Sequence, residues 1–183
     1  MTDIKGFWQG GSQFDRERGD VLVETAVYKK LAERPRTSLI VGPRQSGKST
    51  MLKMLRDAFT ERGHACAYIS LEPVTDSGSE GLNERINKRM VEAIRVETGI
   101  ELPHGIIYAS ADHGGLPRRS IILLDEFTYA AEHSPNFLAR MRGALEGTRR
   151  DLSVILADRT HPTNYRSGAF SPFNFVPRDS HLY

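Results

Sequence analysis

The sequence predicts an α/β fold in three layers, with a mostly parallel sheet and helices on both of its faces. Two observations carry this prediction. Short apolar runs of strand length recur along the chain, and segments with apolar residues at helical spacing lie between them. Strands that alternate with helices form parallel sheets, whose connections cross over the faces. A length of 183 residues fits one such domain with short arms.

Each expected strand is a short apolar run that ends at a polar residue or a turn signal. The runs lie at 37–41, 65–71, 120–124 and 152–157. In the expected helices, apolar residues recur every three or four positions. These helices lie at 21–31, 49–59, 82–94 and 134–145. Ser134 and Pro135 suit the cap and the first position of the last helix.

Composition divides the chain into three parts. Residues 1–33 are expected to form an N-terminal arm and a short helix, and residues 34–162 the core that holds the strands. Residues 163–183 are polar, aromatic and interrupted by proline, so we expect a C-terminal tail there. No strand is expected at 176–179, because Pro177 cannot donate to a central ladder.

The segment after the first strand carries the main chemical motif. It reads Gly42-Pro43-Arg44-Gln45-Ser46-Gly47-Lys48-Ser49 and matches G-x-x-x-x-G-K-[ST] at every fixed position. Its glycines let backbone N–H groups face an anion, and the following helix adds partial positive charge. We therefore expect a P-loop NTPase core that binds nucleotide from Gly42 to Thr50. Lys48 would reach the β- and γ-phosphates and Ser49 would hold Mg²⁺; the alternative is a chance match in an ordinary turn.

Two carboxylates, Asp125 and Glu126, follow the third strand. A buried carboxylate is costly unless it is paired or bound to metal, so Asp125 is the expected second ligand of Mg²⁺. Glu126 is the expected catalytic residue that orients or deprotonates the attacking water, beside Lys48. Two solvated acids in a turn are the alternative. A Glu directly after the magnesium Asp favours hydrolysis over transfer to a small-molecule acceptor.

The fourth strand ends in Asp158-Arg159-Thr160-His161. We expect this strand to lie between the phosphate-loop strand and the Asp-Glu strand, with its polar end at the ligand edge of the sheet. Thr160 or His161 would then act as a sensor that bonds the γ-phosphate or the attacking water. An ordinary polar loop is the alternative.

These motifs resemble the AAA-like family of P-loop ATPases, within the additional-strand NTPases that include the AAA+ and STAND groups. The resemblance rests on four segments: Phe7-Trp8-Gln9-Gly10-Gly11, the Arg44-Gln45 pair of the phosphate loop, Leu124-Asp125-Glu126, and Ser171-Pro172-Phe173-Asn174. It implies ATP and Mg²⁺ as ligands and a nucleotide switch within a larger assembly.

Members of that family continue into a helical lid, whereas this sequence ends at Tyr183. The resemblance therefore implies that another protein chain, or a second copy, supplies a lid or an arginine finger. An arginine finger stabilises transition-state charge. The candidates are Arg149, Arg150, Arg159 and Arg166, although each also fits a solvated surface arginine.

Composition limits the partners. The formal net charge is only +2, which gives no support to a nucleic-acid partner beyond local pairs such as Arg118-Arg119. The longest aliphatic run, at 121–124, is far shorter than the ~20 residues that span a bilayer. No hydrophobic signal core opens the chain, so we expect a cytoplasmic protein without a membrane partner. Cys66 is the single cysteine and reads as a buried small hydrophobe.

Three functions follow from these observations. The first is a Mg²⁺-dependent domain that binds ATP, hydrolyses it and acts as a nucleotide switch. The second is an assembly subunit that keeps the fold without hydrolysis, and the third is a small-molecule kinase. The intact set of Lys48, Ser49, Asp125 and Glu126 favours the first, and Glu126 disfavours the third.

Overall fold

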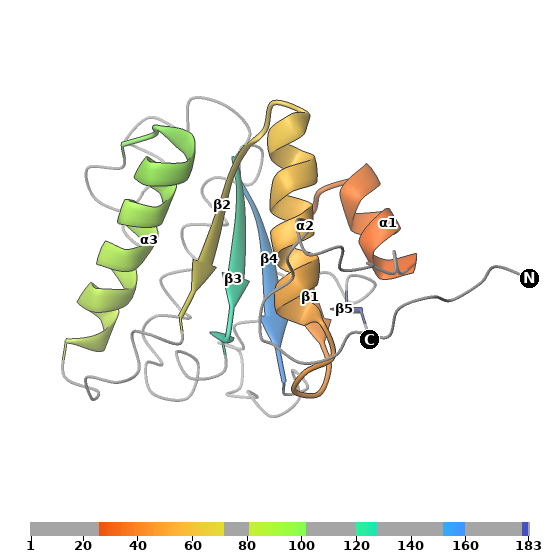
Figure 1. Ribbon diagram of the computed structural model, residues 1–183. Coiled ribbons are helices and arrows are strands. Elements are labelled where there is room, and N and C mark those ends of the chain that lie inside the picture. Colours follow the sequence, from red (N-terminus) through yellow and green to blue (C-terminus); the bar gives the residue numbers. More distant parts are fainter. Residues whose placement is uncertain (1–25, 72–80, 102–119, 128–151, 160–180, 183) are drawn as a thin grey trace, which may run out of the picture.

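A parallel sheet forms the centre of the structure (Figure 1). The computed structural model describes residues 26–71, 81–101, 120–127, 152–159 and 181–182. The strands are β1 (Ser38–Val41), β2 (Ala65–Ser70), β3 (Ser120–Asp125), β4 (Leu152–Asp158) and β5 (His181–Leu182). The helices are α1 (Ala26–Glu33), α2 (Lys48–Glu61) and α3 (Leu82–Thr98).

The strand order is β2-β3-β4-β1-β5, and every pair is parallel. This order confirms the prediction that β4 lies between the phosphate-loop strand and the Asp-Glu strand. The register places Val41 opposite Asp158, and Ser70 opposite Asp125. Because all strands run the same way, their carboxyl ends meet at one edge of the sheet, where the arrowheads lie in Figure 1. In open α/β sheets, ligands bind at this edge.

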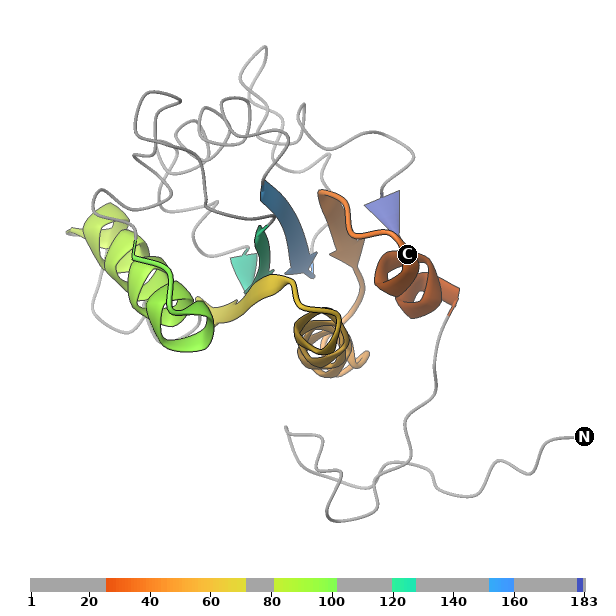
Figure 2. The same cartoon turned by 90° about the horizontal axis from the view of Figure 1, so that it is seen from above.

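The helices cover both faces of the sheet, as the sequence predicts. On one face, α1 and α2 pack against alternate residues of the strands, among them Ile121, Leu123 and Ile155. On the other face, α3 packs against the intervening residues. Seen from above, α2 and α3 lie on different sides of the strands (Figure 2). A strand buried on both faces needs an unbroken apolar run rather than an alternating one, and β3 has this pattern.

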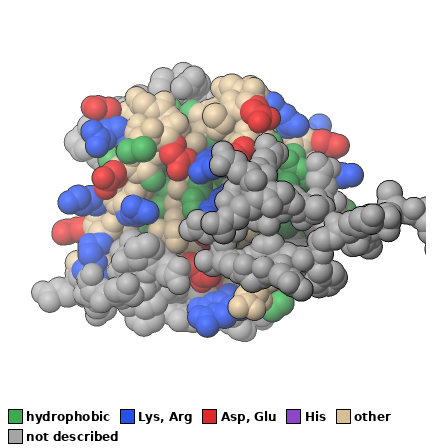
Figure 3. Space-filling view, viewed as in Figure 1, with side chains coloured by type: hydrophobic (Ala, Val, Ile, Leu, Met, Phe, Trp, Pro, Cys, Tyr) green, Lys and Arg blue, Asp and Glu red, His purple; other side chains and the backbone are tan. Residues whose placement is uncertain are grey.

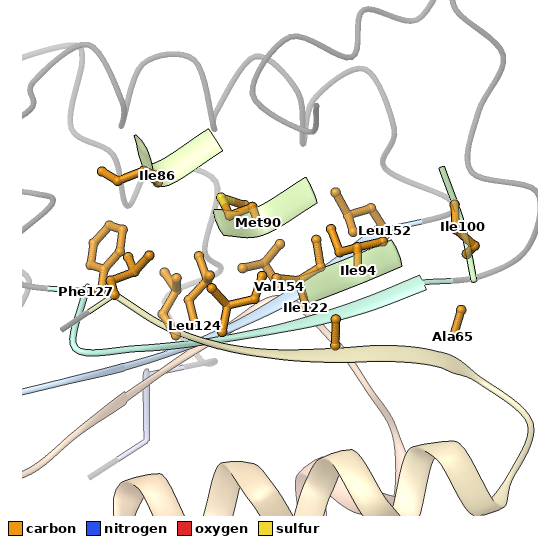
Figure 4. Close-up of a cluster of buried hydrophobic side chains, with 14 of the residues drawn as sticks. Ala65, Ile86, Met90, Ile94, Ile100, Ile122, Leu124, Phe127, Leu152 and Val154 are labelled. Carbon is orange, nitrogen blue, oxygen red and sulfur yellow. The ribbon is translucent and has the colours of Figure 1, made fainter. Parts of the chain in front are cut away.

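The α3 side of the core is built from helical residues one turn apart. Ile86, Met90 and Ile94 point from α3 toward Ile122 and Val154 of the central strands (Figure 4). All of these side chains are buried, so α3 is anchored by its apolar stripe. The helix ends at Gly99, whose left-handed backbone and N–H bond to the Arg95 carbonyl close it.

Within the described residues, most element boundaries differ from the predictions by a few residues, and α3 differs most, since it extends to Thr98 rather than Ile94. Helix α2 begins at Lys48, one residue early, and α1 extends to Glu33, past the predicted end at Leu31. The predicted tail over 163–183 instead adds strand β5 beside β1 at its end. Two residues are too few to produce a periodic pattern, so this strand leaves no signal in the sequence. The predicted helix at 134–145 and positions 176–179 lie outside the described residues. None of the described helices is long and apolar enough to cross a membrane.

Candidate nucleotide-binding site

The phosphate loop, the end of β3 and the end of β4 lie together at the carboxyl edge of the sheet. The loop leaves β1 at Gly42, whose N–H donates to the Asp158 carbonyl at 3.1 Å. The Asp125 carbonyl accepts a bond from the Leu71 N–H, also at 3.1 Å, at the neighbouring strand end. The first bond fixes Gly42 to β4, and the second fixes Asp125 to the end of β2. Both predicted site residues are thus held by neighbouring strands of the same sheet.

The loop reaches α2 through two left-handed residues. Gln45 has φ 61° and Gly47 has φ 82°, a region that costs an L-residue with a Cβ about 1–2 kcal/mol but costs glycine little. Gly47 is the N-cap of α2, and its carbonyl accepts the Met51 N–H at 2.8 Å. A glycine offers no side chain to cap the helix. The N–H groups of the first turn are therefore left to an anionic ligand, which the helix dipole also favours.

A close approach requires glycine at the start of the loop. A Cβ at Gly42 would lie 2.9 Å from Ser46 Oγ and 3.8 Å from Lys48 Cδ. The loop is thus curled so tightly that its first residue and its fifth residue touch. Pro43, Arg44, Gln45 and Ser46 are exposed, so this curled segment faces solvent.

Lys48 turns back onto the loop from the first residue of α2. Its Nζ donates to the Gly42 carbonyl at 2.8 Å and to the Pro43 carbonyl at 2.6 Å. Burial lowers the pKa of Lys48, while the charges of Glu126, Asp125 and Asp158 raise it and Arg159 lowers it. The ammonium group therefore lies inside the curled loop, within the electrostatic influence of the carboxylates at the strand ends.

Asp125 is buried, with 3% of its surface exposed, and each of its oxygens accepts a hydrogen bond. Oδ1 accepts from the Glu126 N–H at 3.0 Å, and Oδ2 accepts from the Tyr68 hydroxyl at 2.8 Å. A carboxylate has about four lone-pair sites, so two acceptor sites remain beyond the bonds from the described residues. An ionised carboxylate with unused acceptor sites in a buried place is chemically suited to a hard cation such as Mg²⁺.

Glu126 leaves the strand in a left-handed conformation, with φ 56°. Strain of this kind persists only where the surrounding structure imposes it, and it is concentrated at functional sites. The Glu126 carboxylate lies 3.8 Å from Arg159 Nε, and both side chains are just over one third exposed. Glu126 is thus partly open to solvent, beside a cation that follows β4.

The structure brings Lys48, Asp125 and Glu126 to one place, and Ser49 and Thr50 lie in the first turn of α2. Thr160 and His161, the predicted sensors, lie outside the described residues, as do Arg149, Arg150 and Arg166. Arg159 faces Glu126 of its own chain. Its role as an arginine finger for a neighbouring subunit stays a prediction.

Sequence reasoning assigns no role to two residues of the site. Tyr68 lies on β2 and its hydroxyl donates to Asp125, but no motif marks it. Asp158 is buried at the end of β4, and its carboxylate accepts the Arg159 N–H. The signal for Asp158 is a carboxylate that ends an apolar strand, as at Asp125. No sequence signal identifies Tyr68.

The donor set can be tested against the predicted magnesium ion. Within the residues that the structure describes, no three His, Cys, Asp or Glu side chains gather closely enough to hold a metal by themselves. Mg²⁺ is usually bound by one or two carboxylates together with substrate phosphates and water. Asp125 and the hydroxyl of Ser49 would therefore suffice in the presence of a bound nucleotide.

The parallel sheet, the curled loop before α2 and the acidic end of β3 define a P-loop NTPase core. A family model described as an AAA domain matches residues 34–158, and the chain belongs to this family. The match begins at the boundary predicted for the core and ends with β4.

Solved structures share this fold at low identity. The first is a DNA replication initiation factor (15% identity, TM-score 0.51, 86% of this chain and 43% of the other). The Drosophila origin recognition complex bound to DNA gives 12% identity and a TM-score of 0.57, over 76% of this chain and 38% of the other. The Aeropyrum pernix ORC1 protein in complex with DNA gives 13% identity and a TM-score of 0.51, over 86% of this chain and 44% of the other. This chain thus spans less than half the length of each. A comparison with curated proteins gives no match.

Proposed function

We propose that this domain binds ATP with Mg²⁺ at Gly42–Thr50, hydrolyses it, and acts as a nucleotide switch in a larger assembly. The observation that carries the proposal is the position of Lys48. Its ammonium group is bonded to the carbonyls of Gly42 and Pro43 inside the loop, next to the buried Asp125. A cation held in this way is available to a phosphate group, which offers it anionic oxygens instead of neutral carbonyls. Membership of the AAA domain family supports ATP as the nucleotide.

Each residue has a distinct role in this proposal. The loop N–H groups and Lys48 bind the phosphates, and Ser49 and Asp125 hold the metal ion. Mg²⁺, when bound, neutralises negative charge on the phosphates. Glu126 accepts a hydrogen bond from the attacking water and takes its proton as the water oxygen attacks the γ-phosphorus, while the bond to the β,γ-bridging oxygen breaks and ADP leaves with that electron pair. The partial exposure of Glu126 is compatible with this role, because water can reach its carboxylate.

The switch in this proposal is the rearrangement of polar contacts at the strand ends. Binding of a γ-phosphate draws Lys48 away from the Gly42 and Pro43 carbonyls. Hydrolysis reverses that change. The N–H bond from Gly42 to Asp158 connects the loop to the end of β4, where Thr160 and His161 would sense the phosphate. Such phosphate-held contacts are a common basis of nucleotide switches.

Another protein chain or a second copy would supply the lid or the arginine finger. Two of the similar structures are complexes with DNA, so DNA belongs among the partners to be tested. The net charge of +2 gives such binding no general support. In Figure 3, Lys and Arg side chains are interspersed with Asp and Glu over the described surface, including the side where α3 lies. A mixed surface of this kind does not attract a polyanion strongly.

Single-turnover hydrolysis tests the proposal. Radiolabelled ATP is mixed with excess wild-type protein, Lys48→Ala or Glu126→Gln, with Mg²⁺ or EDTA, alone and with candidate partners. We expect wild type to bind and cleave ATP, Glu126→Gln to bind without cleavage, and Lys48→Ala to do neither. Wild type that neither binds nor cleaves ATP under any of these conditions would refute the proposal.

One observation favours the alternative of an assembly subunit without hydrolysis. Arg159 lies beside Glu126 and offers its carboxylate a cationic partner other than water. If that pair persists with ATP bound, the domain would bind nucleotide and hold it intact. Full ATP binding without cleavage by wild type would identify this alternative.

A further inference from the structure

Tyr68 is a residue of the site that no motif marks. It lies on β2, in register with Leu123 of β3, and its ring is half-buried against the cluster beneath α2. The phenol reaches across the sheet surface to Asp125, where its hydroxyl donates to Oδ2 at 2.8 Å. The partner of the Tyr68 hydroxyl is thus Asp125, the expected magnesium ligand.

Contacts from both helical layers hold Tyr68 in place. Lys53 Nζ, from α2, lies 5.6 Å from the centroid of the Tyr68 ring, within the range of a cation–π interaction. The backbone N–H of Tyr68 donates to Glu97 Oε2 of α3 at 3.0 Å. Because α3 holds the backbone of Tyr68 and α2 contacts its ring, the side chain loses little further freedom when it makes its hydrogen bond, so its hydroxyl is a pre-oriented donor.

The two hydrogen bonds on Asp125 determine how its carboxylate is turned. The Glu126 N–H holds Oδ1 and the Tyr68 hydroxyl holds Oδ2, so rotation about the carboxylate axis breaks both bonds. The phenol remains a donor, because burial and the Asp125 charge both raise the pKa of Tyr68. Partners that orient a metal ligand are known to influence metal affinity strongly.

We propose that Tyr68 is a positioning residue for the magnesium ion of this site. Its hydroxyl holds the Asp125 carboxylate in one orientation, so that this ligand is already oriented before the magnesium ion binds. This inference rests on the proposed function, because it assigns a role to a neighbour of the proposed ligand. It predicts that Tyr68 affects metal-dependent nucleotide binding and leaves metal-free nucleotide binding unchanged.

The test is the Mg²⁺ dependence of ATP binding by the full chain. Binding of a fluorophore-labelled ATP is followed by anisotropy at increasing free Mg²⁺, starting in EDTA. We expect Tyr68→Phe to need about 10–100-fold more Mg²⁺ than wild type for half of the metal-induced gain in affinity, the usual effect of losing such a partner. Its affinity in EDTA should equal that of wild type, because the phosphate loop is untouched.

Tyr28→Phe is the matched control. Tyr28 packs against the same cluster as Tyr68 but lies on α1, so this variant also removes one phenol hydroxyl from that side of the core. Its Mg²⁺ dependence should be that of wild type. Asp125→Asn, which changes the proposed ligand itself, should remove the metal response.

Two results overturn the inference alone: an unchanged Mg²⁺ requirement in Tyr68→Phe, or an equal loss of affinity in EDTA and in Mg²⁺. If the ATP affinity of wild type does not change with Mg²⁺, both the metal assignment of the proposed function and the inference are wrong. The wild-type curve therefore distinguishes failure of the proposed function from failure of the inference alone. If Tyr68→Phe does not fold, ¹⁹F NMR of 3-fluorotyrosine-labelled wild type replaces it. The Tyr68 signal, assigned through its shift in Asp125→Asn, must then move when Mg²⁺ is added to the ATP complex, and an unmoved signal overturns the inference.

Discussion

Substitution of Gly47 by alanine separates the role of the phosphate loop from its contribution to stability. Gly47 is the N-cap of α2 with φ 82° and ψ 11°. Gly81 is the N-cap of α3 with almost the same backbone, φ 63° and ψ 15°. Each position has room for a methyl group: nothing lies within 4 Å of a Cβ at Gly47, and the nearest atom at Gly81 is 3.6 Å away. The two substitutions therefore impose the same backbone strain at two different helix starts.

The expected loss of stability follows from that backbone. A left-handed L-residue costs about 1–2 kcal/mol. Alanine also restricts the unfolded chain, which returns about 0.4–1 kcal/mol. Gly47→Ala and Gly81→Ala should each lower the free energy of unfolding by about 1 kcal/mol, as measured by urea denaturation.

Nucleotide binding should distinguish the two variants. An alanine at position 47 relieves its backbone strain by changing φ, and this change rotates the peptide groups that face the anion. Gly47→Ala should therefore lose at least about tenfold in ATP affinity, or about 1.4 kcal/mol. Gly81→Ala should bind as wild type does, because α3 supplies no residue to the loop. Equal ATP affinity in both variants, at equal loss of stability, would refute the assignment of the loop.

Three further predictions concern the core, the ion pair and the thiol. Leu123→Ala, at a fully buried position of the central sheet, should lower the free energy of unfolding by about 2–5 kcal/mol, whereas Val96→Ala, 72% exposed, should change it by less than about 0.5 kcal/mol in the same urea titration. Arg159→Ala should change stability by less than about 1 kcal/mol at low or high salt, because its pair with Glu126 is exposed; a larger, salt-dependent loss would contradict that view. Burial raises the pKa of Cys66 to about 12, which disfavours its thiolate. Iodoacetamide at pH 8 should therefore label Cys66 only after denaturant is added. Rapid labelling of the native protein would contradict its burial.

The contiguous parts of the fold could be predicted from the sequence. The β1–loop–α2 unit is encoded within one short segment, because Gly42, Gly47 and Lys48 specify a turn and a helix start by themselves. The same holds for β3, whose apolar run and terminal Asp125 read as a buried strand at a ligand edge. The placement of β4 between these two units was also predicted, whereas the positions of β2 and β5 were not.

The contacts between distant segments could not be predicted. The bond from Tyr68 to Asp125 joins residues that are 57 positions apart. The bond from the Tyr68 N–H to Glu97 spans 29 positions. These pairs depend on the register of β2 against β3 and on the packing of α3, which no local pattern specifies. The pair of Arg159 with Glu126 likewise depends on β3 and β4 ending side by side.

The most direct test of the central claim is calorimetric titration of ATP into the full chain in the presence of Mg²⁺. We expect one binding site in wild type and no measurable binding in Lys48→Ala, since the ammonium group that now rests on the Gly42 and Pro43 carbonyls would be absent. Wild type that takes up no ATP, or a Lys48→Ala variant that binds as tightly as wild type, would contradict the assignment of this loop as a nucleotide site.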